Sequence, residues 1–196
     1  MRKLIVTVIV SLDGYFEGPG KNVMALPMDP AFDAHNLERL RAASTLLLGR
    51  TTYQGFASYW PGVADDQNAP EVEREISRIN NTIEKVVISD TLNAAEVGSA
   101  WADTTEVVPV ANAFRRIAEL KAGEGGDIVM FGSQTLWSAL LAEGLVDELY
   151  LMYGPVALGG GTPAFNAGET ARMSLLGVRT FEGSDNFVAR YDAQPR

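Results

Sequence analysis

The sequence contains no cysteine and only one histidine, His35, in its 196 residues. Without cysteine the chain forms no disulfide and no thiolate zinc site, and it has no thiol nucleophile. One histidine in a helical segment is a weak basis for a Ser-His-Asp triad or a multi-histidine metal site, so no metal is expected. We expect His35 to lie at the surface or to cap a helix.

Long hydrophobic runs and clusters of basic residues are also missing. No stretch approaches the roughly 18 continuous apolar residues of a membrane-spanning helix. The opening MRKLIVTVIV could be mistaken for a secretory signal, but it has no small-residue cleavage site, and its β-branched residues suit a buried strand. The net charge of −9 repels nucleic acid and anionic lipid. We therefore expect a soluble, cytoplasmic protein that binds neither nucleic acid nor membranes.

The composition and patterning that remain are those of one α/β domain over residues 1–196. A hydrophobic share of 46% with 21% charged residues is ordinary for a globular protein, and no linker or repeat divides the chain. Short β-branched runs alternate with segments of helical period. We expect strands at residues 3–10, 45–48, 85–89, 106–108, 127–131, 148–156, 174–180 and 186–192. We expect helices at residues 30–43, 51–58, 69–80, 112–121 and 133–143.

Three local features refine this expectation. The last two strands flank the turn at residues 182–185 and predict a C-terminal antiparallel hairpin. Gly144 follows the last helix as a C-cap glycine. Residues 60–73 form the most polar connection, which predicts a mobile excursion.

The stretch LLLGRTTYQGF, residues 46–56, runs from an apolar strand into a glycine, a cation and two hydroxyls. Backbone amides freed at such a strand-to-helix corner, beside an arginine, suit an anionic group. The alternative is a strand end, a turn and an N-cap without a ligand.

A second corner lies in MFGSQTLWSALL, residues 130–141, where Gly132 breaks a strand and Ser133 begins a helix. The free amides and partial positive charge of a helix N-terminus suit a diphosphate, whereas the alternative is plain N-capping by Ser133. The glycine-rich stretch ALGGGTPAF, residues 157–165, has the spacing of a dinucleotide fingerprint. Pro163 and the lack of a surrounding βαβ unit favour a turn between strands instead.

Five stretches, in this order, resemble the dihydrofolate reductase superfamily and its bacterial branch that includes the reductase domain of the bifunctional riboflavin-biosynthesis deaminase/reductase. They are VSLDGYFEGP, LLLGRTTYQGF, KVVISDTL, IVMFGSQTLWSALLAEGLVDELYL and PVALGGGTPAF. The resemblance implies a dihydrofolate-reductase-like, mixed but mainly parallel sheet flanked by helices, with a C-terminal antiparallel hairpin.

The resemblance also implies a site for NADPH, with NADH as the alternative cofactor. Arg50 and Thr51 would hold the 2′-phosphate, and Thr52 the pyrophosphate. Ser89 would lie near the adenosine ribose. The amides of residues 132–135 would meet the pyrophosphate, and the SLDG segment would border the nicotinamide. The expected cofactor residues are Leu12, Asp13, Gly14, Gly49, Arg50, Thr51, Thr52, Ser89, Gly132, Ser133, Gln134, Thr135 and Leu136.

Two positions depart from the pattern of the relatives. Asp90 follows Ser89 where many relatives have a basic or neutral residue, and a carboxylate repels a 2′-phosphate, which weakens the preference for NADPH over NADH. Thr135 stands where folate-reducing enzymes have an arginine. Arg50 is therefore the main candidate cation.

On the substrate side, the acidic residue that binds the pterin ring in folate reducers aligns with Asp33. We take Asp33 as the catalytic candidate, which would orient a ring or relay a proton. The alternatives are a solvated helix position for Asp33, and Asp29 as either an N-cap or the substrate acid. One or two of five aromatic residues should line a flat-ring pocket. These five are Tyr15, Phe16, Tyr53, Trp60 and Trp137.

The resemblance predicts an NADPH-dependent reductase that transfers hydride to a small heterocycle, such as dihydrofolate or the substrate of a 5-amino-6-(5-phosphoribosylamino)uracil reductase. One alternative is a non-catalytic nucleotide-binding module that serves as a sensor or accessory protein, and another is a structural or partner-binding domain with empty corners. Lacking cysteine, the chain does not carry the Cys-ligated zinc centre of the deaminase partner. A homodimer is expected, paired through edge strands at residues 148–156 or 186–192.

Overall fold

The computed structural model describes residues 1–92, 100–168 and 170–194, and it confirms the expected α/β class. The strands of the main sheet are β1 (Leu4–Val10), β3 (Ala43–Gly49), β4 (Glu84–Ile88), β5 (Thr105–Val108), β6 (Asp127–Phe131), β7 (Glu148–Tyr153), β9 (Ser174–Thr180) and β10 (Phe187–Asp192). The α-helices are α1 (Pro30–Ala42), α2 (Arg50–Val63), α3 (Glu71–Thr82), α4 (Ala113–Ala122) and α5 (Gln134–Ala142). A separate small sheet pairs β2 (Tyr15–Glu17) with β8 (Thr162–Pro163).

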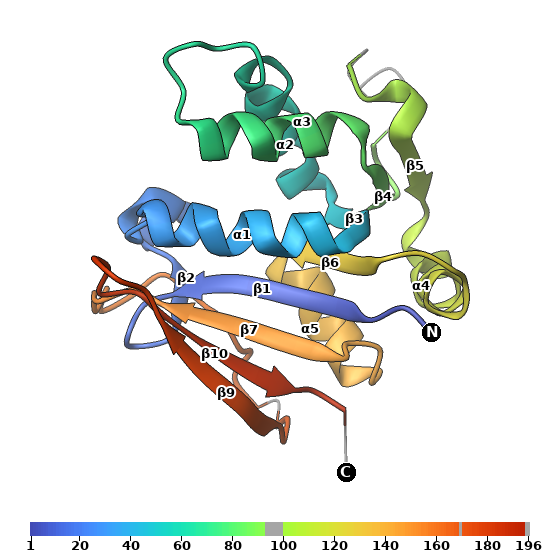
Figure 1. Ribbon diagram of the computed structural model, residues 1–196. Helices are drawn as coiled ribbons and strands as arrows, with labels where there is room; N and C mark the ends of the chain where they lie inside the picture. The colour runs from blue at the N-terminus through green and yellow to red at the C-terminus, as the bar shows by residue number, and fades with distance from the viewer. Residues whose placement is uncertain (93–99, 169, 195–196) are drawn as a thin grey trace.

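The main sheet has the strand order β5-β4-β3-β6-β1-β7-β10-β9 (Figure 1). The strands from β5 to β7 run parallel, and β10 and β9 add two antiparallel pairings at one side. The mixed, mainly parallel sheet and the C-terminal hairpin are therefore as expected. The expected helices and strands all lie close to their predicted positions.

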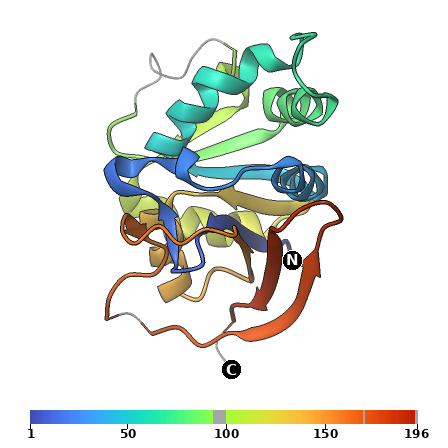
Figure 2. The ribbon, with the colours of Figure 1, turned by 90° about the vertical axis from the view of Figure 1, so that its left-hand side faces the viewer.

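Helices cover both faces of the sheet (Figures 1 and 2). On one face α4 and α5 pack on the sheet, and on the other α1, α2 and α3 do so. Side chains of β3 alternate between them, with Leu47 in the first core and Leu46 and Leu48 in the second. Burial on both faces explains the nearly continuous apolar runs of these parallel strands. In the described ranges, no helix combines the length and the apolar character needed to cross a membrane.

Two local expectations concern the ends of helices. Gly144 follows α5 with a φ of 65°, and the N–H of Leu145 donates to Leu140 O, which confirms the C-cap. The prediction of a long polar connection over residues 60–73 is wrong in part, because α2 continues through Pro61 to Val63 and α3 begins at Glu71.

Side chains of α3 bind two carbonyl groups in the last turn of α2, the turn that contains Pro61. The last four carbonyl groups of a helix have no partner within the helix, and those of Trp60 and Pro61 are among them in α2. Ser77 Oγ donates to Trp60 O at 2.5 Å, and Asn81 Nδ2 donates to Pro61 O at 3.2 Å. The connection between the two helices is thus shortened to residues 64–70.

The sheet ends at β9 and not at the strands predicted to be edges. β7 pairs with β1 and β10, and β10 pairs with β7 and β9, so neither residues 148–156 nor residues 186–192 form an edge. The edge strand β9 exposes Leu175, Leu176 and Val178 to 58%, 46% and 59%. An exposed apolar edge offers unpaired backbone groups and apolar side chains to another chain.

Candidate active site

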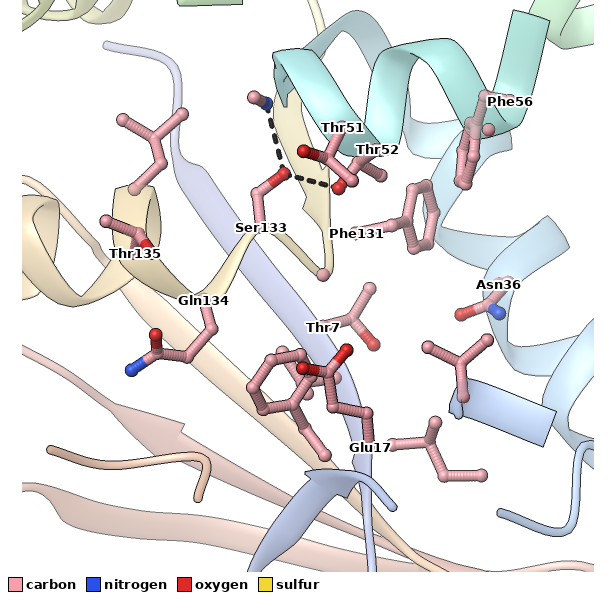
Figure 3. Close-up of a pocket in the computed structure, with 18 of the residues that line it drawn as sticks. Thr7, Glu17, Asn36, Thr51, Thr52, Phe56, Phe131, Ser133, Gln134 and Thr135 are labelled. Atoms are coloured by element: carbon pink, nitrogen blue, oxygen red, sulfur yellow. Dashed lines mark hydrogen bonds between the residues drawn. The ribbon is translucent and has the colours of Figure 1, made fainter. Parts of the chain in front are cut away.

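A cavity of about 970 Å³ lies at the carboxyl ends of β3 and β6 and extends between the sheet and α1, α2 and α3 (Figure 3). Its wall also includes β1, β2 and the first turn of α5. In open α/β sheets, ligands bind outside the carboxyl ends of strands. The volume is that of a pocket for a drug-sized or cofactor-sized molecule.

The two predicted corners meet at this cavity through the side chain of Ser133 (Figure 3). The N–H of Gly49 donates to Ser133 Oγ at 3.0 Å, and Ser133 Oγ donates to Thr52 Oγ1 at 2.7 Å. Ser133 makes no side-chain hydrogen bond to its own helix, so plain N-capping by this serine is contradicted. Gly132 and Ser133 have left-handed φ values of 60° and 56°, and this tight turn lets the hydroxyl reach α2 instead of α5.

Both helices that begin at these corners lack the usual N-terminal caps. Neither α2 nor α5 has a side-chain cap hydrogen bond, and neither has an acidic residue in its first turn. The first turn of each therefore offers backbone N–H groups and the positive end of the helix dipole. Arg50 adds a cation at the start of α2, where its Nη1 donates to Thr91 Oγ1 at 2.8 Å. The arrangement suits an anionic group with several oxygens.

The structure brings ten of the fourteen expected site residues to the cavity wall. These are Asp33, Gly49, Arg50, Thr51, Thr52, Gly132, Ser133, Gln134, Thr135 and Leu136. Leu12, Asp13, Gly14 and Ser89 lie outside the wall. Their ligand roles stay predictions, and the contacts that they do make are local ones.

Asp13 holds the loop after β1 to the glycine-rich turn. Its carboxylate accepts from Ser11 Oγ at 2.6 Å and from the N–H groups of Leu158 and Gly159 at 3.0 and 2.7 Å. These three donors lower the pKa of Asp13 to about 2. Gly14 has a φ of 85°, which favours glycine, and the neighbouring Leu12 is 59% exposed. In this structure the SLDG segment, through Asp13, links the loop after β1 to the glycine-rich turn.

Ser89 organises the turn that reaches Arg50. Its Oγ accepts from the N–H groups of Thr91 and Leu92 at 3.1 and 2.9 Å. The carboxylate of Asp90 accepts from the N–H of Val110 at 2.9 Å, and Val110 itself lines the cavity. Asp90 is thus placed at the rim, on the same turn as the hydroxyl that Arg50 binds.

The two acidic candidates on α1 have different surroundings. Asp29 is the N-cap of α1, and its carboxylate accepts from the N–H groups of Ala31 and Phe32 at 3.0 and 3.2 Å. Asp33 lines the cavity and is half-buried. Burial, reinforced by the charges of Glu73 and Asp29, raises the pKa of Asp33 to about 6. A carboxyl with that pKa exchanges protons near neutral pH.

The expected surface or capping role of His35 is wrong, because the residue is 3% exposed. His35 Nε2 lies 3.2 Å from Thr7 Oγ1, and its ring packs on Tyr150 with centroids 5.5 Å apart. Burial, followed by the charge of Arg39, lowers the pKa of His35 to about 4. The imidazole is therefore uncharged at neutral pH, and it lines the floor of the cavity together with Thr7.

Two of the five expected aromatic residues, Phe16 and Trp60, line the cavity. Tyr53 and Trp137 are buried in the two cores, with exposures of 0% and 1%. Sequence reasoning missed other cavity residues that have polar groups or flat faces. They include Glu17, Lys21, Phe32, Asn36, Phe56, Tyr59, Asn80, Phe114 and Phe131.

Glu17 and the glycine-rich stretch form one side of the cavity. The side chain of Glu17 projects into the cavity in Figure 3, and its Oε1 accepts from Thr162 Oγ1 at 2.5 Å. The glycine-rich stretch is a turn that leads into β8, as predicted. Gly161 has a φ of 132°, and a Cβ there would collide with Glu17 O. The glycine at position 161, which belongs to the dinucleotide-like spacing, is therefore explained by the close backbone contact between β2 and β8.

Known proteins are similar to this chain in sequence and fold. Residues 2–185 match the family of the RibD C-terminal domain. The uncharacterized protein YyaP of Bacillus subtilis (strain 168) is 30% identical over 181 residues, which cover 92% of this chain and 89% of that protein. A putative riboflavin biosynthesis protein from Shewanella sp. PV-4 has a similar structure, with a TM-score of 0.72 and 22% identity over 99% of each chain.

A dihydrofolate reductase from Enterococcus faecalis, solved in complex with NADP(H), has a TM-score of 0.59 and 16% identity, over 97% of this chain and 95% of that one. The fold is therefore that of dihydrofolate reductase, as the sequence resemblance implied. The family model matches most of the chain, and this match identifies the family within the fold. The chain belongs to the RibD C-terminal domain family.

Proposed function

We propose that this protein is an NADPH-dependent reductase that transfers a hydride to a small heterocycle of the dihydrofolate or ribosylaminopyrimidine kind. The observation that carries the proposal is the junction of two uncapped helix N-termini at a cavity that also contains Asp33. Membership of the RibD C-terminal domain family supports it, as does the NADP(H) bound by a dihydrofolate reductase of the same fold. A cytoplasmic location is part of the proposal.

The residues at the two corners fit the diphosphate of a nicotinamide cofactor. The first turns of α2 and α5 would hold the pyrophosphate, and Arg50 would hold the 2′-phosphate beside Thr51. A Cβ at Gly49 would come within 3.3 Å of Ser133 Oγ, so glycine keeps the two corners close together. NADPH, when bound, supplies the hydride.

The remaining chemistry belongs to the chain itself. Reduction of a C=N or C=O group by hydride also needs a proton, and Asp33 is the cavity acid whose raised pKa suits this step. Phe16, Phe56 and Phe131 supply apolar faces that orient a flat ring and exclude water. His35 stays uncharged and has no acid role at neutral pH.

The proposal is tested by following NADPH oxidation at its absorbance band with a panel of acceptors that includes dihydrofolate and aminopyrimidine ribosides. Consumption of NADPH with one of these acceptors supports a reductase. Binding without consumption on any acceptor indicates the nucleotide-binding module instead. Thermal shift measures binding separately, because a thousandfold excess over the dissociation constant stabilises the fold by about 4 kcal/mol. No shift with NADPH or NADH overturns both readings.

The variant Ser133→Ala should weaken the junction of the two corners. It removes the acceptor for the Gly49 N–H and the donor to Thr52, so the free energy of unfolding should fall by about 1–2 kcal/mol. NADPH affinity should fall several-fold because the two helix N-termini are no longer fixed together. Urea denaturation and cofactor titration measure the two effects.

Ser138→Ala on the same helix is the matched control for this variant. Ser138 Oγ accepts from Gln134 Nε2 at 3.1 Å, and among the described residues no side-chain hydrogen bond joins it to the other corner. Its replacement should leave cofactor affinity unchanged. Equal affinity losses in both variants would contradict a specific role for the Ser133 bridge.

We also propose that two copies of the chain pair through the edge strand β9. The apolar side chains of Leu175, Leu176 and Val178 and the unpaired edge of the strand would then be covered. Light scattering after gel filtration should give twice the chain mass of 21.1 kDa. Val178→Lys should shift the protein to the monomer, because it places a charge in the middle of the covered edge. Leu12→Lys, at an exposed leucine outside β9, should leave the mass unchanged.

A further inference from the structure

Asn80 is a polar residue on the buried face of an otherwise amphipathic helix. α3 presents charged residues to solvent, where Glu71 pairs with Arg74 and Arg78. On its buried face, Ile76 and Asn80 are one turn apart, with exposures of 3% and 0%, and both line the cavity. The helical pattern favours an apolar residue at this position.

Neither polar atom of the Asn80 carboxamide has a hydrogen-bond partner among the described residues. A carboxamide has two donor hydrogens and one acceptor oxygen. Leaving such groups buried and unpaired is costly, so native proteins nearly always satisfy them. A leucine at position 80 would fill the same space without that cost.

The neighbouring asparagine has the opposite environment. Asn81 Nδ2 donates to Pro61 O at 3.2 Å, and Asn81 Oδ1 accepts from Trp101 Nε1 at 2.8 Å. Its carboxamide is satisfied within the protein and fixes α3 against α2 and the segment around Trp101. Of these two adjacent asparagines, Asn81 has hydrogen-bond partners and Asn80 has none among the described residues. The buried, unpaired carboxamide of Asn80 is the feature that points to a ligand.

The surroundings of Asn80 select the ligand group. Leu40, Trp60 and Ile76 line the same cavity, and hydrogen bonds are stronger in apolar surroundings. Asp29 and Glu73 act on Asp33 through their negative charges, so an anionic group is disfavoured near this carboxyl. An uncharged group with a C=O beside an N–H satisfies both atoms of a carboxamide at once.

We propose that Asn80 is a specificity-determining residue of the cavity and recognises a ring lactam, a C=O beside an N–H, on the substrate. The two polar atoms of Asn80 are inaccessible in this structure, so the side chain must turn toward the cavity to contact the substrate, and it takes no part in proton or hydride transfer. The inference deepens the proposed function, since it assumes that the cavity holds the substrate. Its test uses binding alone, without cofactor or turnover.

The test compares two flat bicyclic probes, isoquinolone, which is a ring lactam, and isoquinoline, which has the same rings without the carbonyl group. Titration near neutral pH, followed by the fluorescence of Trp60 and the other tryptophans or by calorimetry, gives both dissociation constants. The wild-type protein should bind isoquinolone roughly 10- to 50-fold more tightly than isoquinoline. In Asn80→Leu and Asn80→Ala this preference should fall to about twofold or less.

Stability measurements separate ligand recognition from a structural role. Asn80→Leu should melt at or above the wild-type temperature, because it removes an unpaired buried group. Asn81→Ala is the control, which should melt lower but keep the preference for isoquinolone. A wild-type protein that binds both probes equally, or neither, overturns the inference, and so does an Asn80→Leu variant that retains the preference. NADPH binding, measured separately by thermal shift, decides the reductase proposal whatever the probes show.

Discussion

Replacing Arg50 with alanine is expected to weaken NADPH binding about 10- to 150-fold, a loss of roughly 1.5 to 3 kcal/mol. Arg50 begins α2 at the cavity wall, and the turn containing Thr91 holds its guanidinium. A positioned guanidinium can bind two phosphate oxygens at once, which an N-terminal amide cannot replace. Fluorescence titration of NADPH and NADH against the wild-type and variant proteins measures the effect.

The comparison of the two cofactors locates the phosphate that Arg50 binds. If the guanidinium holds the 2′-phosphate, NADPH affinity falls and NADH affinity stays nearly constant. If it holds the pyrophosphate, both affinities fall together. Arg116→Ala is the matched control, because Arg116 pairs with Glu106 outside the cavity and its loss changes the net charge equally. Unchanged binding of both cofactors in Arg50→Ala would refute the assignment of this corner.

Asp33→Asn should lower kcat about 100- to 10,000-fold, the range for removal of a positioned general acid. The amide keeps the shape of the side chain and still donates and accepts hydrogen bonds, but it does not deliver a proton. The wild-type rate should decline as the pH rises above about 6, where Asp33 loses its proton. That decline should vanish from the residual activity of the variant. A change in KM alone, with the pH profile retained, would assign Asp33 to ring orientation instead.

The same substitution should raise stability at neutral pH. Because the folded-state pKa of Asp33 lies above its unfolded value, the wild-type protein loses stability as the pH rises from about 4 to 6. Asp33→Asn removes this loss and should gain about 1 to 2 kcal/mol at pH 7. Urea denaturation at several pH values measures the difference.

Asp29→Ala is the control for both effects. It removes the N-cap of α1 and should cost about 1 kcal/mol. It also removes one of the charges that raise the pKa of Asp33, so the pH profile should shift slightly downward and remain. A stability loss in Asp33→Asn equal to that in Asp29→Ala would contradict the raised pKa of Asp33.

The secondary structure was predictable because its signals are local. β1 and α5 have the apolar runs and periods of a buried strand and of a helix packed on a sheet. The order of the strands has no such local signal, so the sequence did not show that β10 lies between β7 and β9. The edge prediction failed for that reason.

The family resemblance predicted that the corners at residues 49–52 and 132–135 belong to one site. The residues alone did not show that these two corners lie together. Gly49 and Ser133 are 84 positions apart, and only the fold joins them. His35 has the polar character of a surface residue, and its burial follows from the contact of α1 with Thr7 and Tyr150 on the sheet. Asn80 was hidden for the same reason, because an asparagine on a helix that carries many charged residues looks solvated.

The close approach of Gly161 to Glu17 O gives this glycine an influence over ligands, although Gly161 itself does not line the cavity. Any larger residue at position 161 must push β8 away from β2, because the added Cβ has no other space. β2 carries Phe16 and Glu17, which line the cavity. Evolution of new substrate preference in this scaffold would thus be constrained to keep a glycine there and to vary the walls on α1, α2 and α3 instead.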